Sequence, residues 1–472
     1  MGEFGGIYDV LYHVDQHRTY GGHVGNGGYE KSYADILNIV RDNINTNHAS
    51  ELANVIAEPN GQKVLKSLIS KYLHHDNLKC DDYTYSELVE KIFEDMAGFG
   101  FLTKHLYDED VEEININAWN DIEIITSTGY QKLSEHFLSP QQCIDMVRKM
   151  CALGGVIIDG SQPLKDSYIS KGVRISAMIP PVIDEELGAS ASIRRQRTTA
   201  ITRQQIIQWG TADEKELDFL MLCLEHGVSV AIAGSTGAGK TTDLGLLLSG
   251  LPANKRIYVI EDSRELNLIK INESNQVISR VVHTKTRFSD DSKQNVSNDD
   301  LLKEALRYDP DIIVPAEMRG AEAMTAQEAG RTGHTICTTV HADDARAAYT
   351  RILTLCMNSD TKLSEDRMLS LIVDAFPVML FKSQFADKTR KYKEIVEAVG
   401  CEGQEVKCEY LFRYMIEDNN PKHIKGRHVQ TGCISDRLAD RLYEHSAPIE
   451  EIRKYARKEW QPAMMVQKEV IT

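Results

Sequence analysis

The sequence has 472 residues, of which 26% are charged and 42% hydrophobic, and its formal net charge is −16. At roughly 100–200 residues per domain, this length predicts about two to four domains of an ordinary globular protein. The acidic balance argues against a dedicated nucleic-acid-binding protein, which usually carries a basic field. We therefore expect no stable nucleic-acid partner.

Nine cysteines are scattered along the chain, and none forms a C-x-x-C pair. This pattern predicts reduced, mostly buried thiols rather than a disulfide framework or a zinc site. No apolar stretch approaches the ~18 residues of a membrane span, and the longest two, 228–233 and 371–381, are short enough to be buried strands. The N-terminus lacks a signal-peptide pattern. We expect a soluble cytoplasmic protein, and docking on a membrane complex stays open.

The residue pattern in the first part of the chain predicts a leader and one domain that contains both helices and strands. Residues 1–30 are rich in Gly, His and Tyr without a core pattern, so we expect a flexible leader. Residues 31–205 are expected to form an α+β domain with a helical front, because helical spacing gives way to strand-like alternation near residue 110. The expected strands are 111–117, 121–125, 174–179 and 191–195, with a helix over 139–151.

Strands and helices alternate from about residue 215, which predicts a mostly parallel, doubly wound sheet in a second domain over 206–433. The expected strands are 228–233, 257–260, 277–282, 312–316, 335–339, 378–381 and 392–399. The expected helices are 241–248, 298–307, 322–330 and 344–355. The chain is expected to end in a charged helical tail over 434–472.

Residues 234–241 read GSTGAGKT between a strand pattern and a helix pattern, and they match the P-loop motif G-x-x-x-x-G-K-[ST]. The glycines let backbone N–H groups converge on phosphate oxygens, and the helix N-terminus adds positive potential. Lys240 is expected to reach the β- and γ-phosphates of ATP, and the Thr241 hydroxyl to bind Mg²⁺. The alternative is an accidental glycine-rich turn. The predicted nucleotide-binding residues are Gly234, Ser235, Thr236, Gly237, Ala238, Gly239, Lys240, Thr241, Thr242 and, from a later motif, His334.

Two later strands end in acidic residues. Glu261 and Asp262 follow the strand at 257–260, and Glu317 ends the segment DPDIIVPAE. Acids at the carboxyl edge of a parallel sheet lie near a bound nucleotide, and one of them usually organises Mg²⁺ and the attacking water. A polar strand end is a common structural feature, and Pro315 is unfavourable in a central strand, so a purely structural role is the alternative. The predicted metal-binding residues are Thr241, Glu261, Asp262 and Glu317.

Two histidines, His334 and His341, flank the strand expected at 335–339. A histidine at a strand end can contact phosphate or relay a conformational change, and an ordinary polar strand end is the alternative.

Four segments therefore stand in order: GSTGAGKT, VIEDSREL, DPDIIVPAEMRG and TGHTICTTVHAD. This series resembles the type II/type IV secretion ATPase superfamily, in which the segments are called the Walker A, Asp, Walker B and His boxes. SKGVRISAMIPPV, ASIRRQ and KEIVEAVGCEGQEVKCEYLFRY extend the resemblance to the Tad-pilus and conjugation branch, over roughly residues 31–415. Two positions depart from the pattern. Pro315-Ala316 stands where the family usually has Val-Gly, and Asp243 stands where an apolar residue is usual.

The resemblance implies an α/β fold, in which an N-terminal α+β domain is followed by a RecA-like P-loop ATPase domain with a mostly parallel sheet. It further implies a homohexamer that hydrolyses ATP with Mg²⁺ and powers assembly or secretion by a Tad-type pilus or type IV secretion machine. Such a motor works at the inner face of the cell membrane, on a platform protein of the inner membrane.

The resemblance also carries roles to single residues. Glu317 resembles the glutamate that positions water, Glu261 and Asp262 resemble the acids near Mg²⁺, and the two histidines resemble the His-box pair. Three arginines resemble those of the N-terminal domain that approach the phosphates, although surface ion pairs with the many acids are the alternative. The predicted catalytic residues are Glu317, Lys240, Glu261, Arg174, Arg194, Arg195 and His341.

Two other functions fit part of the sequence. The first is a DNA-handling motor, against which the acidic charge and the order of the four motifs argue. The second is a nucleotide-gated scaffold that binds ATP with little turnover, against which the presence of all candidate catalytic groups argues.

Overall fold

The computed structural model describes residues 32–48, 61–81, 83–108, 110–126, 129–170, 172–195, 201–287 and 292–462, so the leader expected at 1–30 lies outside the described residues. The chain divides into two compact units. The first comprises Met1–Asp108 and Glu135–Leu138, and the second comprises Glu109–Ser134 and Ser139–Thr472. Over the described residues, no helix combines the length and the apolar character that crossing a membrane requires.

The first unit is a small helical bundle. Its helices are α2 (Tyr33–Asn47), α4 (Gly61–His75), α5 (Tyr85–Ala97) and α6 (Leu102–Tyr107). Buried apolar residues of α2, α4 and α5 form one core cluster. Polar residues set the helix starts: the side chain of Ser32 caps α2, and Thr84 and Glu87 form a capping box on α5. The helical front expected from the sequence is therefore present.

The second unit begins with an antiparallel sheet of six strands in the order β3-β2-β1-β6-β5-β4. The strands are β1 (Val111–Ala118), β2 (Asp121–Thr126), β3 (Gly129–Lys132), β4 (Leu164–Ser170), β5 (Val173–Met178) and β6 (Ser190–Arg195), with a 3-10 turn at Glu185–Leu187. Helix α7 (Pro140–Leu153) packs on β4 and β5, and the side chain of Ser139 caps its first turn. Strand β6 pairs with both β1 and β5, which places the arginines of β6 in the middle of this sheet.

A second sheet of nine strands forms the larger part of the unit, in the order β15-β14-β13-β12-β7-β11-β10-β8-β9. Its strands are β7 (Val230–Gly234), β8 (Arg256–Glu261), β9 (Arg280–Lys285), β10 (Ile312–Pro315), β11 (Thr335–Val340), β12 (Val378–Gln384), β13 (Arg390–Glu402), β14 (Glu405–Asn420) and β15 (His423–Gln430). The six strands from β12 to β9 run parallel to their neighbours, and β13, β14 and β15 are antiparallel additions. The mostly parallel α/β sheet expected from the sequence is confirmed.

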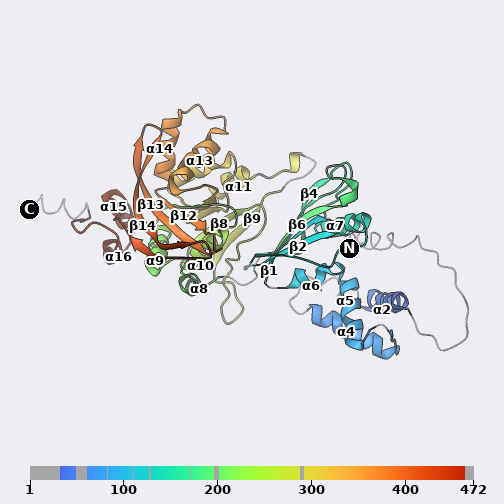
Figure 1. Cartoon of the computed structure of the whole chain (residues 1–472). Coiled ribbons are helices and arrows are strands. Elements are labelled where there is room, and N and C mark those ends of the chain that lie inside the picture. Colours follow the sequence, from blue (N-terminus) through green and yellow to red (C-terminus); the bar gives the residue numbers. More distant parts are fainter. Residues whose placement is uncertain are drawn as a thin grey trace, which may run out of the picture. The chain divides into compact units, whose positions relative to one another are not determined.

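Helices cover both faces of this sheet (Figure 1). They are α8 (Arg203–Gln208), α9 (Glu214–Glu225), α10 (Lys240–Gly250), α11 (Asn298–Ala305), α12 (Glu322–Arg331), α13 (Ala345–Met357), α14 (Glu365–Ala375), α15 (Asp436–Glu444) and α16 (Ile449–Arg453), with a 3-10 turn at Ser292–Gln294. Strand β7 shows the two layers directly, because Val230 and Ile232 belong to one core cluster while Ala231 and Ala233 belong to the other.

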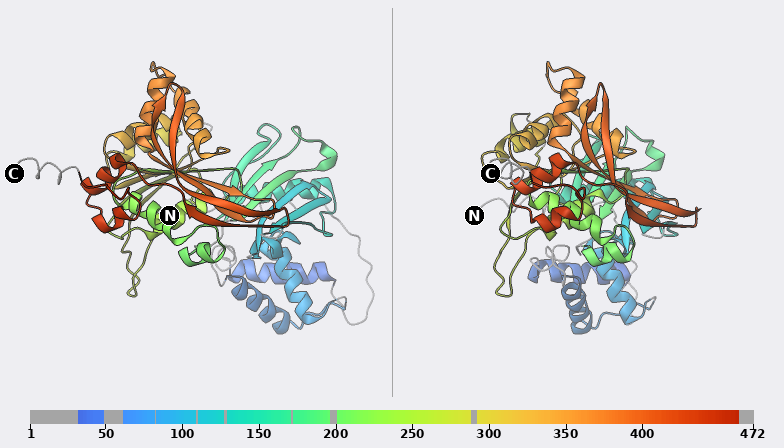
Figure 2. Two further views of the ribbon diagram at one scale, coloured as in Figure 1. Left: turned by 60° about the vertical axis from the view of Figure 1, so that its left-hand side comes forward. Right: turned by 90° about the vertical axis from the view of Figure 1, so that its left-hand side faces the viewer.

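The last helices that the structure describes, α15 and α16, contribute to the sheet's core. Leu438, Leu442 and Trp460 lie in the same apolar cluster as Leu220 of α9 and Leu244 of α10. Residues 436–453 thus contain two helices, α15 and α16, that pack on the same face of the sheet as α9 and α10. Strands β14 and β15 form a long hairpin that projects from the sheet edge (Figure 2). All nine cysteines are free, and five of them are buried.

Candidate functional site

The loop between β7 and α10 has a backbone that only glycine accommodates at its ends. Gly234 has a φ of 158°, and a Cβ atom there would lie 2.3 Å from the backbone oxygen of Lys382. Gly239 has a φ of 84° and is the N-cap of α10. Ser235, Thr236 and Gly237 between them are exposed, Ala238 is buried, and Thr241 and Thr242 are half-buried in the first helical turn. The predicted nest is thus formed at the start of a helix of eleven residues.

Lys240, the first residue of α10, points back into this loop. Its Nζ donates hydrogen bonds of 3.0 Å to the carbonyl oxygens of Gly234 and Ser235, and it lies 3.4 Å from the ring nitrogens of His341. Burial lowers the pKa of Lys240 to about 8; the charges of Arg194 and Arg319 act in the same direction, and Glu317 opposes them. The ammonium group therefore stands in a position where an anion would stabilise its charged form.

Glu317 follows β10 and is held by two side chains. The Nη2 atom of Arg319 donates to its Oε2 at 2.6 Å, and the Nε2 atom of His341 lies 3.2 Å from its Oε1. Burial alone raises the pKa of Glu317, but the hydrogen bond from Arg319 and the nearby positive charges bring this pKa below its usual value. The side chain is consequently an ionised carboxylate at neutral pH, as a group that orients water must be.

One pocket gathers all four residues predicted to bind the metal ion. Its lining includes Thr241, Glu261, Asp262 and Glu317, which are the four predicted metal-binding residues. Six lining residues are absent from the sequence-based prediction, and three of them, Asn298, Glu265 and Arg319, carry a charged or amide side chain. Arg319 lies two positions after Glu317 and was detectable as the arginine of the Glu-Met-Arg-Gly ending. Asn298 belongs to no motif, and only the folding of the chain brings it, at the start of α11, to the pocket.

The two acids after β8 have different surroundings. Oε1 of Glu261 accepts hydrogen bonds of 2.8 Å from the backbone N–H groups of Glu265 and Leu266, and the side chain is 3% exposed. Asp262 is more accessible, with Oδ1 accepting from Thr286 and Asn298 and Oδ2 lying 3.7 Å from Arg319. Glu261 is therefore engaged in holding the turn after β8, while Asp262 keeps its second oxygen directed at the basic group of the pocket.

The three predicted arginines do not all face the site. Arg174 on β5 lines the pocket and pairs with Asp166 at 2.6 Å. Arg194 on β6 lies directly opposite Arg174 in the strand register, so both side chains leave the same face of the six-stranded sheet. Arg195 is the next residue of β6 and points to the opposite face. The structure thus brings Arg174 and Arg194 toward the site and does not bring Arg195 there.

The two histidines lie at opposite ends of β11. His341 follows the carboxyl end of the strand and contacts both Lys240 and Glu317. His334 precedes the amino end, and the six residues of β11 separate it from His341. At ~3.3 Å per residue, this distance is about 20 Å, so His334 does not reach the P-loop of its own chain. The contact of His334 with the nucleotide stays a prediction.

Pro315 is compatible with a central strand because it is the last residue of β10. The next residue, Ala316, donates its N–H to the carbonyl oxygen of Ile260 at 2.9 Å, and Met318 donates to Thr339 at 3.0 Å. The hydrogen bonds to both neighbouring strands continue beyond the proline, which leaves Glu317 anchored from two sides.

Among the described residues, no group of three or more His, Cys, Asp or Glu side chains is arranged to hold a metal ion by itself. Mg²⁺ is usually bound by one or two protein oxygens together with substrate phosphates and water. The Thr241 hydroxyl and the carboxylates of Asp262 and Glu317 line one pocket and supply suitable oxygens.

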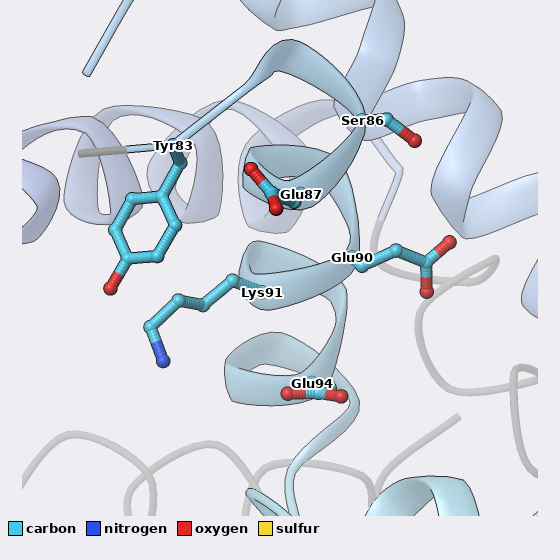
Figure 3. Close-up of a pocket in the computed structure, with 6 residues that line it drawn as sticks. All are labelled: Tyr83, Ser86, Glu87, Glu90, Lys91 and Glu94. Carbon is cyan, nitrogen blue, oxygen red and sulfur yellow. The ribbon is translucent and has the colours of Figure 1, made fainter. Parts of the chain in front are cut away.

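The helical unit contains another hollow, on the surface of α5 (Figure 3). Its acidic side chains already serve the fold. Glu87 caps α5, and Glu90 pairs with Lys66 at 2.6 Å. Lys91 lies 5.7 Å from the ring of Tyr83. This hollow is a solvated helix face, and we assign no chemistry to it. Its lining residues are Tyr83, Ser86, Glu87, Glu90, Lys91 and Glu94.

Comparison with known proteins places the sequence in a family. Residues 158–465 match the model of the type II/IV secretion system protein family. An uncharacterized protein of Methanocaldococcus jannaschii, MJ0900, is 26% identical over 360 residues, which are 76% of this chain and 62% of that protein. The type IV secretion system protein PtlH of Bordetella pertussis is 37% identical over 141 residues, which are 30% of this chain and 40% of PtlH.

Among solved structures, the ATPase DotB of Legionella pneumophila is 19% identical, with a TM-score of 0.46 over 68% of this chain and 80% of DotB. The family match alone spans more than half of the chain and includes the P-loop, Glu317 and both histidines. The chain therefore belongs to the type II/IV secretion system protein family.

Proposed function

We propose that this chain is a Mg²⁺-dependent ATPase that works as a homohexameric motor of a Tad-type pilus or related type IV secretion machine. The observation that supports hydrolysis most directly is the chain of contacts from Lys240 through His341 to Glu317 and Arg319, which places a phosphate-binding lysine beside an ionised carboxylate. A protein that only bound nucleotide would not need the second of these groups.

In this proposal the phosphates of ATP bind the N–H groups of the loop 235–239 and the N-terminus of α10. Lys240 exchanges its hydrogen bonds with the carbonyl oxygens of Gly234 and Ser235 for bonds to the β- and γ-phosphates. Thr241 and the pocket carboxylates would hold Mg²⁺, which offsets negative charge on the phosphates. Glu317 accepts a hydrogen bond from the attacking water and orients it, while Arg319 and His341 keep the carboxylate in place.

The test is a turnover assay on the purified chain with ATP and Mg²⁺, together with mass measurement in solution. We expect steady hydrolysis and a hexamer. Binding without turnover would favour the nucleotide-gated scaffold, and turnover that requires DNA would favour the DNA-handling motor. Since the chain spans only 62% and 40% of the two relatives named above, the motor's substrate and membrane partner are also proposals. Co-purification of a platform protein of the inner membrane tests them.

Arg174→Ala and Arg194→Ala are expected to keep ATP affinity and to lose most turnover. An arginine that reaches the γ-phosphate contributes roughly 10³–10⁵ in rate. Both side chains leave the face of the six-stranded sheet that carries Arg174 into the pocket. Steady-state kinetics and ATP titration on each variant measure the effect.

Arg195→Ala is the matched comparison, because Arg195 neighbours Arg194 in sequence and points to the opposite face. We expect a clearly smaller loss of turnover for this variant. Equal turnover in the parent and in both pocket-facing variants would show that these arginines form only surface ion pairs.

A further inference from the structure

A buried ion pair lies directly beneath the P-loop. Asp243 is in the first turn of α10 and is fully buried, and Lys382 on β12 is 2% exposed; Nζ of Lys382 lies 2.6 Å from Oδ2 of Asp243. A buried ion pair is weak evidence for stability, because well-packed apolar side chains of similar volume are often as stable or more so. The position of this pair therefore calls for another explanation.

Lys382 contacts the P-loop and the helix that follows it at three points. Its backbone pairs with Gly234 in the register of β12 and β7, and its backbone oxygen occupies the space that a side chain at Gly234 would need. Its Nζ donates to the carbonyl oxygen of Gly239 at 3.4 Å, at the residue that begins α10. The third contact is Asp243. Arg390 on β13 adds a hydrogen bond of 2.8 Å to the carbonyl oxygen of Gly237.

Asp243 presents an electrostatic difficulty for a phosphate site. Its carboxylate lies four residues after Gly239, in the first turn of the helix whose positive end attracts phosphate. Charges interact strongly in a poorly solvated environment, so an uncompensated carboxylate there would repel the phosphates of ATP. Lys382 is the cation paired with it.

We propose that Lys382 is a positioning residue of the nucleotide site, which neutralises Asp243 and holds the carbonyl of Gly239 so that α10 presents a positive end to the phosphates. This inference rests on the proposed nucleotide site. It assigns Lys382 no contact with ATP, since its side chain is buried under the loop.

The experiment compares ATP dissociation constants of the parent, Lys382→Met, Asp243→Asn and the double variant, each after its folding is verified by circular dichroism and thermal unfolding. We expect Lys382→Met to raise Kd by at least about tenfold, because Asp243 loses the cation in contact with it and keeps only the charge of Arg390 to offset it. Asp243→Asn and the double variant are expected to stay within about threefold of the parent, because the repelling charge is gone. The loss in Lys382→Met should be larger for ATP than for ADP, since ATP carries the extra phosphate.

A purely structural ion pair predicts a different pattern. Both single variants would then be destabilised, and the folded fraction of Lys382→Met would bind ATP like the parent, which would overturn the proposal. A double variant as weak as Lys382→Met would overturn it too. If Lys382→Met does not fold, Lys382→Gln replaces it, because the amide can still hydrogen-bond Asp243 while carrying no charge.

Lys391→Met is the matched control. Lys391 is also a buried lysine, but its Nζ donates to the carbonyl oxygens of Trp209 and Gly210. We expect it to lose stability and to keep ATP affinity. Failure of the parent to bind ATP would contradict the proposed function itself. Normal ATP binding by the parent with no difference between the Lys382 and Asp243 variants would contradict this inference alone.

Discussion

We expect Lys240→Ala to abolish productive ATP binding, with a loss of at least roughly 10²-fold in affinity or turnover. Lys240 is the cation that stands inside the loop 235–239, and its ammonium group donates to the carbonyl oxygens of Gly234 and Ser235 at 3.0 Å and lies 3.4 Å from the ring nitrogens of His341. Removing it leaves the γ-phosphate without its main side-chain cation. Isothermal titration with ATP and a turnover assay measure the two effects.

The fold should survive this substitution. Burial lowers the pKa of Lys240 to about 8, which shows that the folded protein disfavours its charged form. Loss of the side chain leaves two loop carbonyl oxygens without its hydrogen bonds, and both lie next to solvent-exposed residues. Lys255→Ala is the control. Its Nζ also donates to a backbone carbonyl, that of Glu225 at 2.8 Å, and it precedes β8 at the other edge of the sheet. Full hydrolysis by Lys240→Ala would exclude the P-loop assignment.

The parallel strands were predictable because each is a short run of apolar residues that can be recognised without knowing the rest of the fold. In β7, β8, β10 and β11 nearly every residue is buried, so an apolar run between polar turns indicates the strand directly. The same rule misplaced β9. The sequence predicts a strand over 277–282, but Val277 and Ile278 are 63% and 47% exposed and precede the strand, which starts at Arg280. An apolar run cannot distinguish a buried strand from an exposed apolar loop.

Other elements escaped prediction for related reasons. The run 371–381 suggested a buried strand, yet 371–375 end α14 and 378–381 begin β12, with Pro377 between them. Buried helix and buried strand look alike over so short a run. Strands β14 and β15 alternate weakly because much of their hairpin is exposed. Their pairing with β13 depends on the chain topology, which hydrophobic periodicity does not predict.

Site residues were predictable where one motif holds them together. Lys240 and Thr241 sit within the P-loop, and Glu317 ends a buried strand, so sequence spacing alone places them at one sheet edge. Lys382 and Asn298 reach the same region from distant segments and carry no motif. The separation of His334 from His341 was predictable from the sequence, since residues at the two ends of one strand lie on opposite edges of a sheet.

The difference between Arg194 and Arg195 needed the strand register. Both arginines fit the resemblance equally well, and neighbouring residues of a strand face opposite sides. Only the pairing of Arg194 with Arg174 shows which of the two shares the pocket-facing side.

Glu317→Gln is expected to bind ATP with nearly the parent's affinity and to hydrolyse it more slowly by roughly 10²-fold or more. The amide keeps the size of the side chain and one oxygen for Arg319, but it no longer offers an ionised carboxylate to the attacking water. Single-turnover kinetics with ATP and Mg²⁺ separate the slow chemical step from binding, and ATP titration checks that affinity is retained.

Glu261→Gln is the matched comparison, because both carboxylates line the same pocket. Glu261 uses one oxygen to accept two backbone hydrogen bonds, at Glu265 and Leu266, and the amide oxygen of glutamine can accept the same two. The turn after β8 is then preserved, so this variant should retain much more turnover than Glu317→Gln. If Glu261→Gln were instead the slower enzyme with unchanged stability, the water-orienting role would belong to Glu261, and the contacts of Glu317 with Arg319 and His341 would serve only to brace the loop after β10.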